Sequence, residues 1–304
     1  MSATFLPRWT PGLSSRGLRR RWLLAPAFPV LLVLTGCPPE DPPPDPDVAP
    51  EVDPVLEAWA SWAPLLDARL VDLTHPFDEE TLVWPTSDEF EKQEVFAGRT
   101  PEGYYYEAYN IFSPEHGGTH LDAPIHFMEE RWRADEIPID RLVGPGAVVH
   151  LPEADEEDPN YEASVEDFQA WEDEHGSIPE GAVVLLAYHR SEDWPDGEAY
   201  MGTDARGEEA IADLEFPGLA PDAASWLAEE RGVAAVGIDT PSIDHGPSEM
   251  FEAHQNLFEH NVPVFENVAN LEDLPATGAL ILALPMKVGG GSGGPLRIVA
   301  ALDE

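Results

Sequence analysis

The stretch at residues 116–127 reads HGGTHLDAPIHF and places three histidines and an aspartate within twelve residues. Its glycines and proline argue against a helix, because both residue types destabilise helix interiors. In an extended or turning backbone, side chains two residues apart can share one face, so His120 and Asp122 would point the same way. Gly117 and Gly118 would let the chain fold back and bring His116 beside them.

Two imidazoles and one carboxylate suit Zn²⁺ or Mn²⁺, and they leave coordination positions open for water and substrate. From the spacing alone, a hydrogen-bonded polar loop remains the alternative to a metal site. A fourth polar group, His126, follows Pro124, which fixes the direction of the chain. The cluster therefore predicts a metal site with one further histidine beside it.

The pattern H-x-G-T-H-x-D-x-P-x-H stands here without a gap and resembles the signature of the cyclase-like metal-dependent hydrolases, which include bacterial kynurenine formamidases and isatin hydrolases. The resemblance covers roughly residues 68–302, through the segments 70–85, 216–248, 253–275 and 285–300. It implies an α/β fold: a single domain with a mixed central β-sheet or barrel-like core and flanking helices, of the swivelling β/β/α type.

The resemblance also implies roles for individual residues. His116, His120 and Asp122 would be metal ligands, and His126 would act as proton donor and acceptor beside the metal. In the formamidases a histidine and a glutamate, twelve residues apart near the C-terminus, complete the metal site. His254 and Glu266 match that spacing. The resemblance implies Zn²⁺ or Mn²⁺ as the metal. The formamidases have a two-metal site, whereas the isatin-hydrolase branch resembles a single-manganese arrangement, so one or two cations per subunit are expected.

Four further residues are candidates for contact with the substrate. Trp84 and Phe127 could form aromatic walls, although core packing is the plainer interpretation of both. His245 in SIDHG would be a pocket residue. Ser292 lies in the glycine-rich segment KVGGGSGGP at 287–295, which lacks the order of a phosphate-binding loop and is expected as a tight loop near the pocket.

These features predict a hydrolase that cleaves a small amide or cyclic amide with metal-activated water. The alternative is a lipid-anchored binding protein that keeps the fold and the metal but does not turn its ligand over. The expected partners are a small-molecule substrate and, by the habit of the family, a second copy of the chain in a homodimer.

The N-terminal region carries the marks of export. Residues 1–36 hold five arginines before a short apolar run that ends in Leu-Thr-Gly, and Cys37 follows, as in the lipobox of a bacterial lipoprotein signal peptide. Prolines alternate with acids from Pro38 to Pro54, which predicts a solvated tether at residues 37–64 before a hydrolase domain at 65–304. We therefore expect acylation of Cys37 and attachment to a membrane of the cell envelope, in the periplasm or at the surface.

The charge balance excludes some partners. The chain has 59 acidic residues against 16 lysines and arginines. Such a surface repels nucleic acid and anionic membranes, so the lipid would be the only link to a membrane. Cys37 is the only cysteine, so no intramolecular disulfide can form.

Short apolar runs predict strands at 69–75, 146–151, 181–188, 232–239 and 278–285. Helical spacing of apolar residues predicts helices at 164–175, 221–231 and 252–261. Three segments look like surface insertions. The first, at 98–110, is expected as a lid or subunit contact because of its tyrosines, and the segments at 152–162 and 191–210 are expected as solvated acidic loops.

Overall fold

The computed structural model describes Leu65 and residues 67–303. The predicted signal peptide, Cys37 and the predicted tether lie outside the described residues. Within this part of the chain, no helix is both long and apolar enough to cross a membrane.

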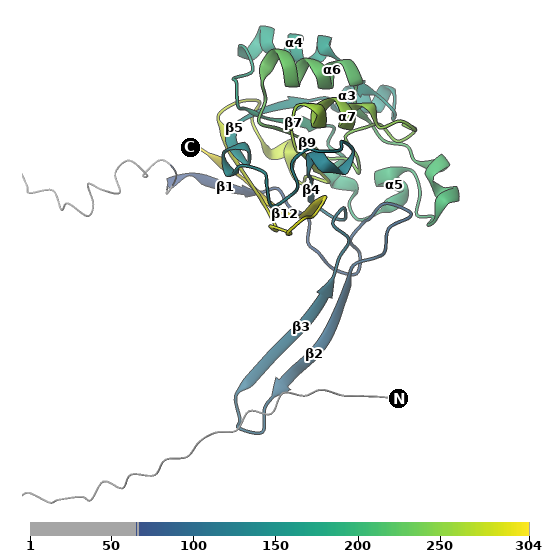
Figure 1. Ribbon diagram of the computed structural model, residues 1–304, viewed down its shortest axis with the longest axis vertical. Coiled ribbons are helices and arrows are strands. Elements are labelled where there is room, and N and C mark those ends of the chain that lie inside the picture. Colours follow the sequence, from purple (N-terminus) through teal and green to yellow (C-terminus); the bar gives the residue numbers. More distant parts are fainter. Residues whose placement is uncertain (1–64, 66, 304) are drawn as a thin grey trace, which may run out of the picture. The chain divides into compact units, whose positions relative to one another are not determined.

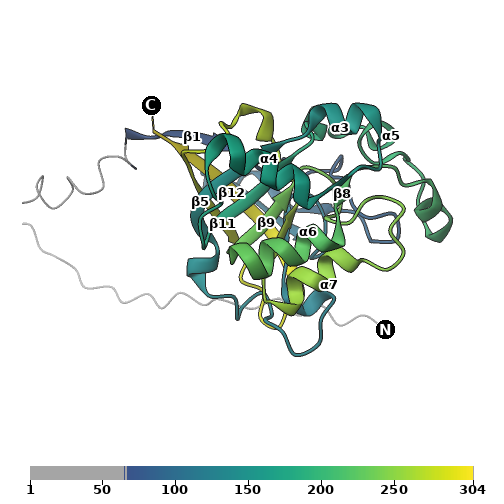
Figure 2. The same cartoon turned by 90° about the horizontal axis from the view of Figure 1, so that it is seen from above.

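Seven strands close into a mixed β-barrel, seen from two sides in Figures 1 and 2. Four neighbouring strands run parallel to one another through three pairings. The other four pairings of the ring are antiparallel. In ring order the strands are β12 (Gly293–Leu302), β11 (Ala279–Pro285), β5 (Val143–His150), β7 (Val183–Ala187), β9 (Ala235–Ile238), β10 (Val264–Glu266) and β4 (His120–Asp122). The barrel closes because β4 pairs with β10 on one side and with the start of β12 on the other.

An eighth strand, β1 (Arg69–Asp72), pairs with the end of β12. All five predicted strands are therefore confirmed as β1, β5, β7, β9 and β11. Their apolar residues fill one core cluster inside the barrel and a second beneath the helices. The sequence did not predict β4, β10 or β12, because the first two are three residues long and the third begins in the glycine-rich segment.

Three helices cover the β5, β7 and β9 region of the sheet (Figure 2). They are α4 (Val165–His175), α6 (Pro221–Trp226), which continues as one π turn at Leu227–Arg231, and α7 (Glu252–Glu259). The Asp167 carboxylate caps α4 by accepting from the Ser164 backbone N–H at 2.7 Å. Gly232 ends the π turn in the left-handed conformation. The three predicted helices are confirmed.

The prediction of a solvated loop at 191–210 is wrong. The segment holds α5 (Gly197–Met201) between 3₁₀ turns at Arg190–Asp193 and Glu208–Asp213, and the Tyr200 ring is fully buried. The acidic composition of the segment led to the loop prediction, but burial of the Tyr200 ring stabilises folded structure there. The segment at 152–162 also holds structure: α3 (Pro152–Glu157) and the start of β6 (Glu162–Ala163), which pairs with β8 (Gly218–Leu219).

The segment at 98–110 belongs to a long hairpin. Strand β2 (Glu91–Arg99) pairs antiparallel with β3 (Tyr105–Phe112), with one irregularity between Glu94 and Phe96. The two strands form a separate sheet and extend away from the barrel (Figure 1). The remaining described elements are 3₁₀ turns at Pro124–His126, Ile139–Arg141 and Leu271–Asp273.

Candidate metal centre

Strand β4 places the central polar residues at the seam where the barrel closes. His120 and Asp122 are two residues apart on this strand and so share one face, as the sequence predicted. Across the seam, Glu266 of β10 is the register partner of His120, and Gly293 of β12 is the partner of Asp122. One short strand therefore brings groups from three segments of the chain together.

His116 joins this group because the preceding loop turns tightly. Gly118 has a φ of +60°, and a Cβ atom there would lie 2.8 Å from the Phe77 ring. On the other side, a Cβ at Gly293 would lie 2.5 Å from the Leu121 carbonyl oxygen and 2.7 Å from the His116 ring. Glycine at 118 therefore permits the turn, and glycine at 293 leaves the room that the His116 ring occupies.

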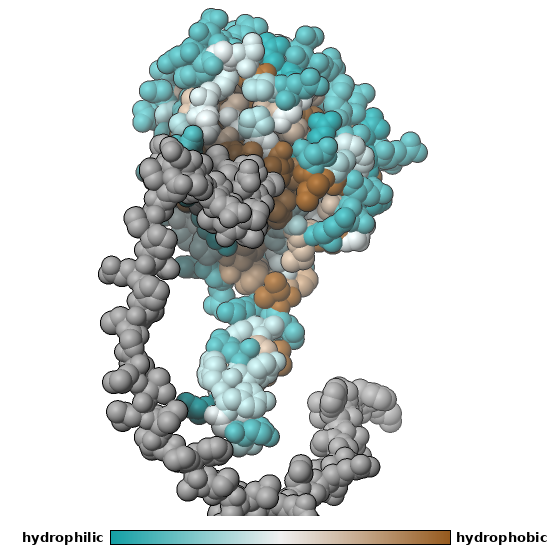
Figure 3. Space-filling view, turned by 90° about the vertical axis from the view of Figure 1, so that its left-hand side faces the viewer, coloured by the Kyte–Doolittle hydropathy of each residue, from teal (hydrophilic) through white to brown (hydrophobic). Residues whose placement is uncertain are grey.

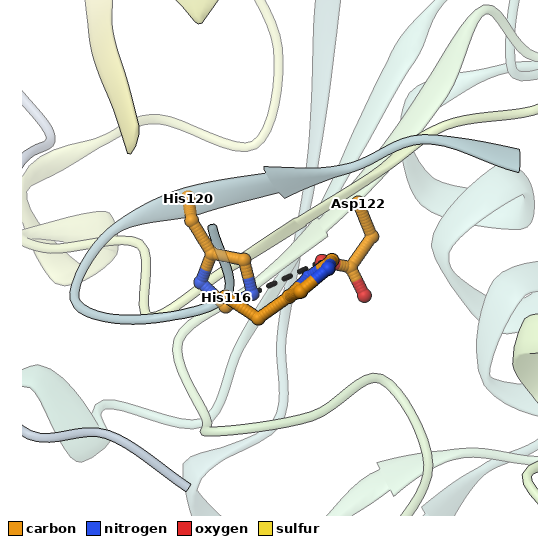
Figure 4. Close-up of side chains that lie close together, drawn as sticks. All are labelled: His116, His120 and Asp122. Carbon is orange, nitrogen blue, oxygen red and sulfur yellow. Dashed lines mark hydrogen bonds and ion pairs between the residues drawn. The ribbon is translucent and has the colours of Figure 1, made fainter. Parts of the chain in front are cut away.

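The five predicted ligands form two overlapping groups that share Asp122. The ligand atoms of His116, His120 and Asp122 lie within 4.8 Å of one another, and so do those of Asp122, His254 and Glu266. Figure 4 shows the first group, with both imidazoles turned toward the carboxylate. His254, from helix α7, lies 3.1 Å from Glu266 and 3.2 Å from Asp122. A shared carboxylate between two donor sets can serve one cation or two.

Burial and charge perturb the pKa values of this cluster strongly. Burial opposes ionisation of Asp122, but the facing His116, His126 and His120 outweigh it and lower the pKa of the carboxyl well below its usual range. For His120, burial lowers the pKa, but the Asp122 and Glu266 carboxylates outweigh it and raise the value to about 10. The pKa of His254 is also raised, against burial, by Asp122, Asp244 and Glu266. The carboxylates thus create a site that attracts positive charge.

A divalent cation fits these donors. The Nε2 atom of His120 is buried and has no hydrogen-bond partner, although Asp122 Oδ1 is 3.0 Å away and Glu266 Oε2 is 3.3 Å away. A buried nitrogen without a partner is costly unless something else satisfies it. Three imidazoles with two carboxylates are ligands of the kind that Zn²⁺ and Mn²⁺ take in proteins.

Each of the three imidazoles is held through its other ring nitrogen, as is usual for metal ligands. His120 Nδ1 lies 2.9 Å from the Gly118 carbonyl oxygen, and His254 Nδ1 lies 2.6 Å from the Asp244 carboxylate. His116 Nε2 lies 2.8 Å from the Ser292 hydroxyl. These outer contacts fix the ring orientations before any ligand binds.

Beside the cluster lies a cavity of about 240 Å³, whose walls are partly aromatic. Trp84, Phe127 and Phe251 line it together with all five candidate ligands and His126. Phe127 stacks on Phe251 with 5.0 Å between the ring centroids and contacts the His254 ring. Trp84 and Phe127 thus lie where the sequence analysis placed them, at the wall of the cavity.

His126, at the end of the Pro124–His126 turn, faces the same cavity. Its ring stacks on the His116 ring with 3.8 Å between the centroids, and its Nε2 atom lies 3.8 Å from Asp122. Burial lowers the pKa of His126 to about 4, although the Asp122 charge opposes the shift. The imidazole is therefore neutral at neutral pH and able to accept a proton.

Two predicted contact residues do not line the cavity. His245 Nδ1 lies 3.2 Å from the Glu162 carboxylate, and His245 is not among the residues that line the cavity. Ser292 contacts His116 from behind rather than from the cavity side.

The sequence analysis missed Asp244, Phe251 and Met201, of which the first holds His254 and the other two line the cavity. Asp244 is adjacent to His245, which the sequence did single out, but spacing gave no reason to prefer the carboxylate. Met201 was assigned to a solvated loop. Only the packing of α5 and α7 around the barrel brings these side chains to the site.

The family model "Cyclase: Putative cyclase" matches residues 71–245, more than half of the chain. The chain belongs to the cyclase family. This cyclase-family chain is 31% identical to the isatin hydrolase of Roseibium aggregatum over 198 residues, which is 62% of the chain and 73% of the relative. It is 26% identical to the kynurenine formamidase of Polaromonas naphthalenivorans over 231 residues, 76% of the chain and 90% of the relative.

The fold of this chain is also similar to that of a solved isatin hydrolase structure. Isatin hydrolase A from Labrenzia aggregata bound to benzyl benzoate superimposes with a TM-score of 0.71 and 32% identity, covering 83% of this chain and 99% of that one. The family and the expected fold are therefore confirmed, and the buried histidine and carboxylate cluster lies inside the matched region except for His254 and Glu266.

Proposed function

We propose that this cyclase-family protein is a metal-dependent amidohydrolase that opens a small cyclic amide or cleaves a small aryl amide. The observation that carries the proposal is the convergence of His116, His120, Asp122, His254 and Glu266 at one wall of a partly aromatic cavity. These five residues would hold the cation. Similarity to isatin hydrolases and kynurenine formamidases supports the reaction class.

A bound divalent cation supplies two effects: it lowers the pKa of water toward about 7 and polarises a carbonyl oxygen. His126 supplies the proton transfers. Its neutral ring accepts a proton from the attacking water and returns it to the amide nitrogen as the C–N bond breaks, so a cyclic amide opens to an amino carboxylate and an aryl formamide releases an aryl amine and formate. Burial keeps the His126 ring neutral, and stacking on His116 fixes its plane.

The cavity favours a flat substrate. Trp84 and the stacked pair Phe127 and Phe251 all line the cavity and offer aromatic surface to a planar ring. One of the relatives is an isatin hydrolase, and isatin is a flat, two-ring cyclic amide. A small planar molecule of this kind suits a cavity of about 240 Å³. We therefore place cyclic amides such as isatin ahead of N-formyl aryl amines.

The test combines metal analysis of the purified protein with assays on isatin, aryl formamides and cyclic imides. We expect Zn²⁺ or Mn²⁺ to bind at one or two equivalents per chain and hydrolysis of at least one cyclic amide. Tight binding of these compounds without turnover would support the binding-protein alternative instead. Failure of any divalent metal to bind after reconstitution would contradict the proposal.

We also propose that the protein acts in the cell envelope, attached through an acylated Cys37. The lipobox-like Leu-Thr-Gly-Cys sequence and the acidic, proline-rich segment after it support this location. Expression of the full chain and of Cys37→Ser in a bacterial host tests it. The full chain should fractionate with membranes and Cys37→Ser should not; equal release of both proteins would contradict the anchor.

A further inference from the structure

Behind the candidate ligand His116, Glu115 and Ser292 form a short chain of hydrogen bonds. One Glu115 carboxylate oxygen, Oε2, accepts from both the Ser292 backbone N–H and the Ser292 hydroxyl, each at 2.8 Å. The same hydroxyl oxygen lies 2.8 Å from His116 Nε2. The Ser292 backbone is also fixed by its carbonyl oxygen, which accepts from the Ala123 N–H at 2.8 Å. A Cβ at Gly291 would lie 2.8 Å from the other Glu115 oxygen, so glycine there leaves room for the carboxylate.

The direction of these hydrogen bonds follows from the number of protons available. A carboxylate oxygen can only accept, and the Ser292 hydroxyl has one proton. Donation of that proton to His116 would leave two acceptors, Ser292 Oγ and Glu115 Oε2, facing each other at 2.8 Å. The hydroxyl therefore donates to Glu115, and Ser292 Oγ accepts from His116 Nε2–H. A neutral imidazole that donates from Nε2 has its lone pair at Nδ1, the atom that lies 2.6 Å from Asp122 Oδ1.

We infer that Glu115 and Ser292 are positioning residues that select the tautomer of His116 and so make Nδ1 its metal-binding atom. The inference rests on the proposed function. In this tautomer Nδ1 and the Asp122 oxygen are both acceptors, and two acceptors 2.6 Å apart repel each other unless both bind a cation. The outer hydrogen bonds of His116 thus prepare the inner pair of donors for a metal.

The test measures metal affinity of the purified protein and its variants by competition with a chelator. Ser292→Ala removes the acceptor of the Nε2 proton and should weaken affinity about 10- to 100-fold. Glu115→Ala should weaken it as much, because the freed hydroxyl can then donate to Nε2. Glu115→Gln keeps an oxygen that can accept both hydrogen bonds and should stay within about threefold of the unmodified protein. The double alanine variant should be no weaker than either single one, because both residues act through one hydrogen bond.

Unchanged affinity in Ser292→Ala overturns the inference. So do equal losses in Glu115→Gln and Glu115→Ala, because they mark the loss of a charge rather than of an acceptor. Nitrogen NMR of the zinc-loaded protein gives a second readout: the ring proton of His116 should lie on Nε2, and a proton on Nδ1 contradicts the assignment. Ser225→Ala, on helix α6, is the control and should bind metal normally. Absence of metal binding in the unmodified protein overturns the proposed function itself.

A second, independent observation concerns Arg206 and the segment that carries Trp84. Nη1 of the Arg206 guanidinium donates to the carbonyl oxygens of Val83 and Trp84, each at 3.1 Å. Nη2 donates to the carbonyl oxygen of Ser87. The backbone N–H of the residue after Arg206 donates to the Pro85 carbonyl oxygen at 2.9 Å. One side chain and its neighbour thus hold four carbonyl groups of a single short segment.

The other side of this segment is attached to the loop of the candidate metal ligands. The Gly118 N–H donates to the Leu82 carbonyl oxygen at 3.0 Å. Val83 forms an antiparallel bridge with Gly117. Trp84, at the cavity wall, is therefore held between two anchors, and its backbone position relative to the metal centre depends on both.

The Arg206 anchor lies where the β2–β3 hairpin leaves the body. Arg206 and Ser87 line a surface hollow there together with Ile111 and Phe112 of β3. Figure 3 shows apolar surface where the narrow hairpin meets the body. Ser87 also lines the cavity, so a shift of this residue would change the shape of the cavity wall.

We infer that Arg206 is a positioning residue that sets specificity for planar aromatic substrates by holding the backbone of Trp84. This inference also rests on the proposed function. Arg206→Gln should raise KM for isatin about tenfold, with kcat and metal content within about twofold of the unmodified protein. The KM or inhibition constant of succinimide, which has no aromatic ring, should not change. Arg297→Gln, which removes another exposed arginine outside the cavity lining, is the control.

Deuterium exchange over residues 82–87 gives a readout that does not depend on turnover. It should become faster in Arg206→Gln and stay unchanged in Arg297→Gln. Unchanged exchange in Arg206→Gln, or an equal loss of affinity for isatin and succinimide, overturns this inference. Failure of the unmodified protein to bind or hydrolyse any cyclic amide overturns the proposed function instead.

Discussion

Two antiparallel strand pairings of this protein reverse the usual distribution of polar and apolar residues. At the β4–β10 seam, His120, Asp122 and Glu266 are charged or polar and 2–4% exposed. In the β2–β3 hairpin, Tyr105 and Ile111 are both 61% exposed. Buried polar groups and exposed apolar patches are the informative exceptions in a folded protein, because each costs free energy until something binds it. The two regions therefore mark candidate binding surfaces of opposite chemistry, one for positive charge and one for apolar groups.

The largest effect is expected at the shared carboxylate of the seam. Asp122→Asn keeps the shape of the side chain but removes the charge that the three facing histidines share. Metal content should fall to background, and kcat/KM for a cyclic amide should drop by at least about a thousandfold. Metal analysis and steady-state kinetics measure this; retention of both metal and activity would show that Asp122 is not a ligand.

Removal of the proposed proton carrier should have a smaller effect. His126→Gln keeps a polar side chain beside His116 but cannot take up a proton. We expect kcat to fall about 10²- to 10⁴-fold with metal content unchanged, which separates this residue from the ligands. If the variant loses metal as well, His126 is a ligand and the proton passes elsewhere.

A backbone substitution tests how tightly the seam is packed. A Cβ at Gly293 would lie 2.5 Å from the Leu121 carbonyl oxygen, whereas at Gly289 nothing lies within 4 Å. Gly293→Ala should therefore lower the free energy of unfolding by about 2–3 kcal/mol, and Gly289→Ala should change it by less than about 0.5 kcal/mol. Denaturant unfolding measures both, and equal stability of the two variants would contradict the packing argument.

The smallest effect, taken over a single pH unit, is a pH dependence of stability outside the seam. His75 stacks on Trp194 with 4.2 Å between the ring centroids, and burial lowers its pKa to about 4. Between about pH 4 and 6.5 the unfolded state binds the extra proton, so this residue lowers stability as pH falls, by at most about 1.4 kcal/mol per pH unit. His75→Phe keeps the stacking and should remove this contribution. Parallel pH profiles of unfolding for the two proteins would show that His75 does not titrate in this range.

The sequence predicted most of the scaffold because its signals are local. The apolar runs of β5, β7 and β9 and the helical spacing of α4 depend only on neighbouring residues. It failed where burial contradicts composition, as for Tyr200 in the acidic segment at 191–210. It also failed at the hairpin, where alternation of apolar and polar residues is absent because both faces are exposed.

The sequence by itself determined the chemistry of one strand and its turn: His116, His120 and Asp122 lie together because strand geometry and two glycines place them so. Only the tertiary structure decided that His254 and Glu266 face that strand, that Asp244 holds His254 and that Ser292 holds His116. These groups lie 120 or more residues away along the chain. They meet because β4 is hydrogen-bonded between β10 and β12, and pairing between distant strands depends on barrel closure rather than on any local pattern.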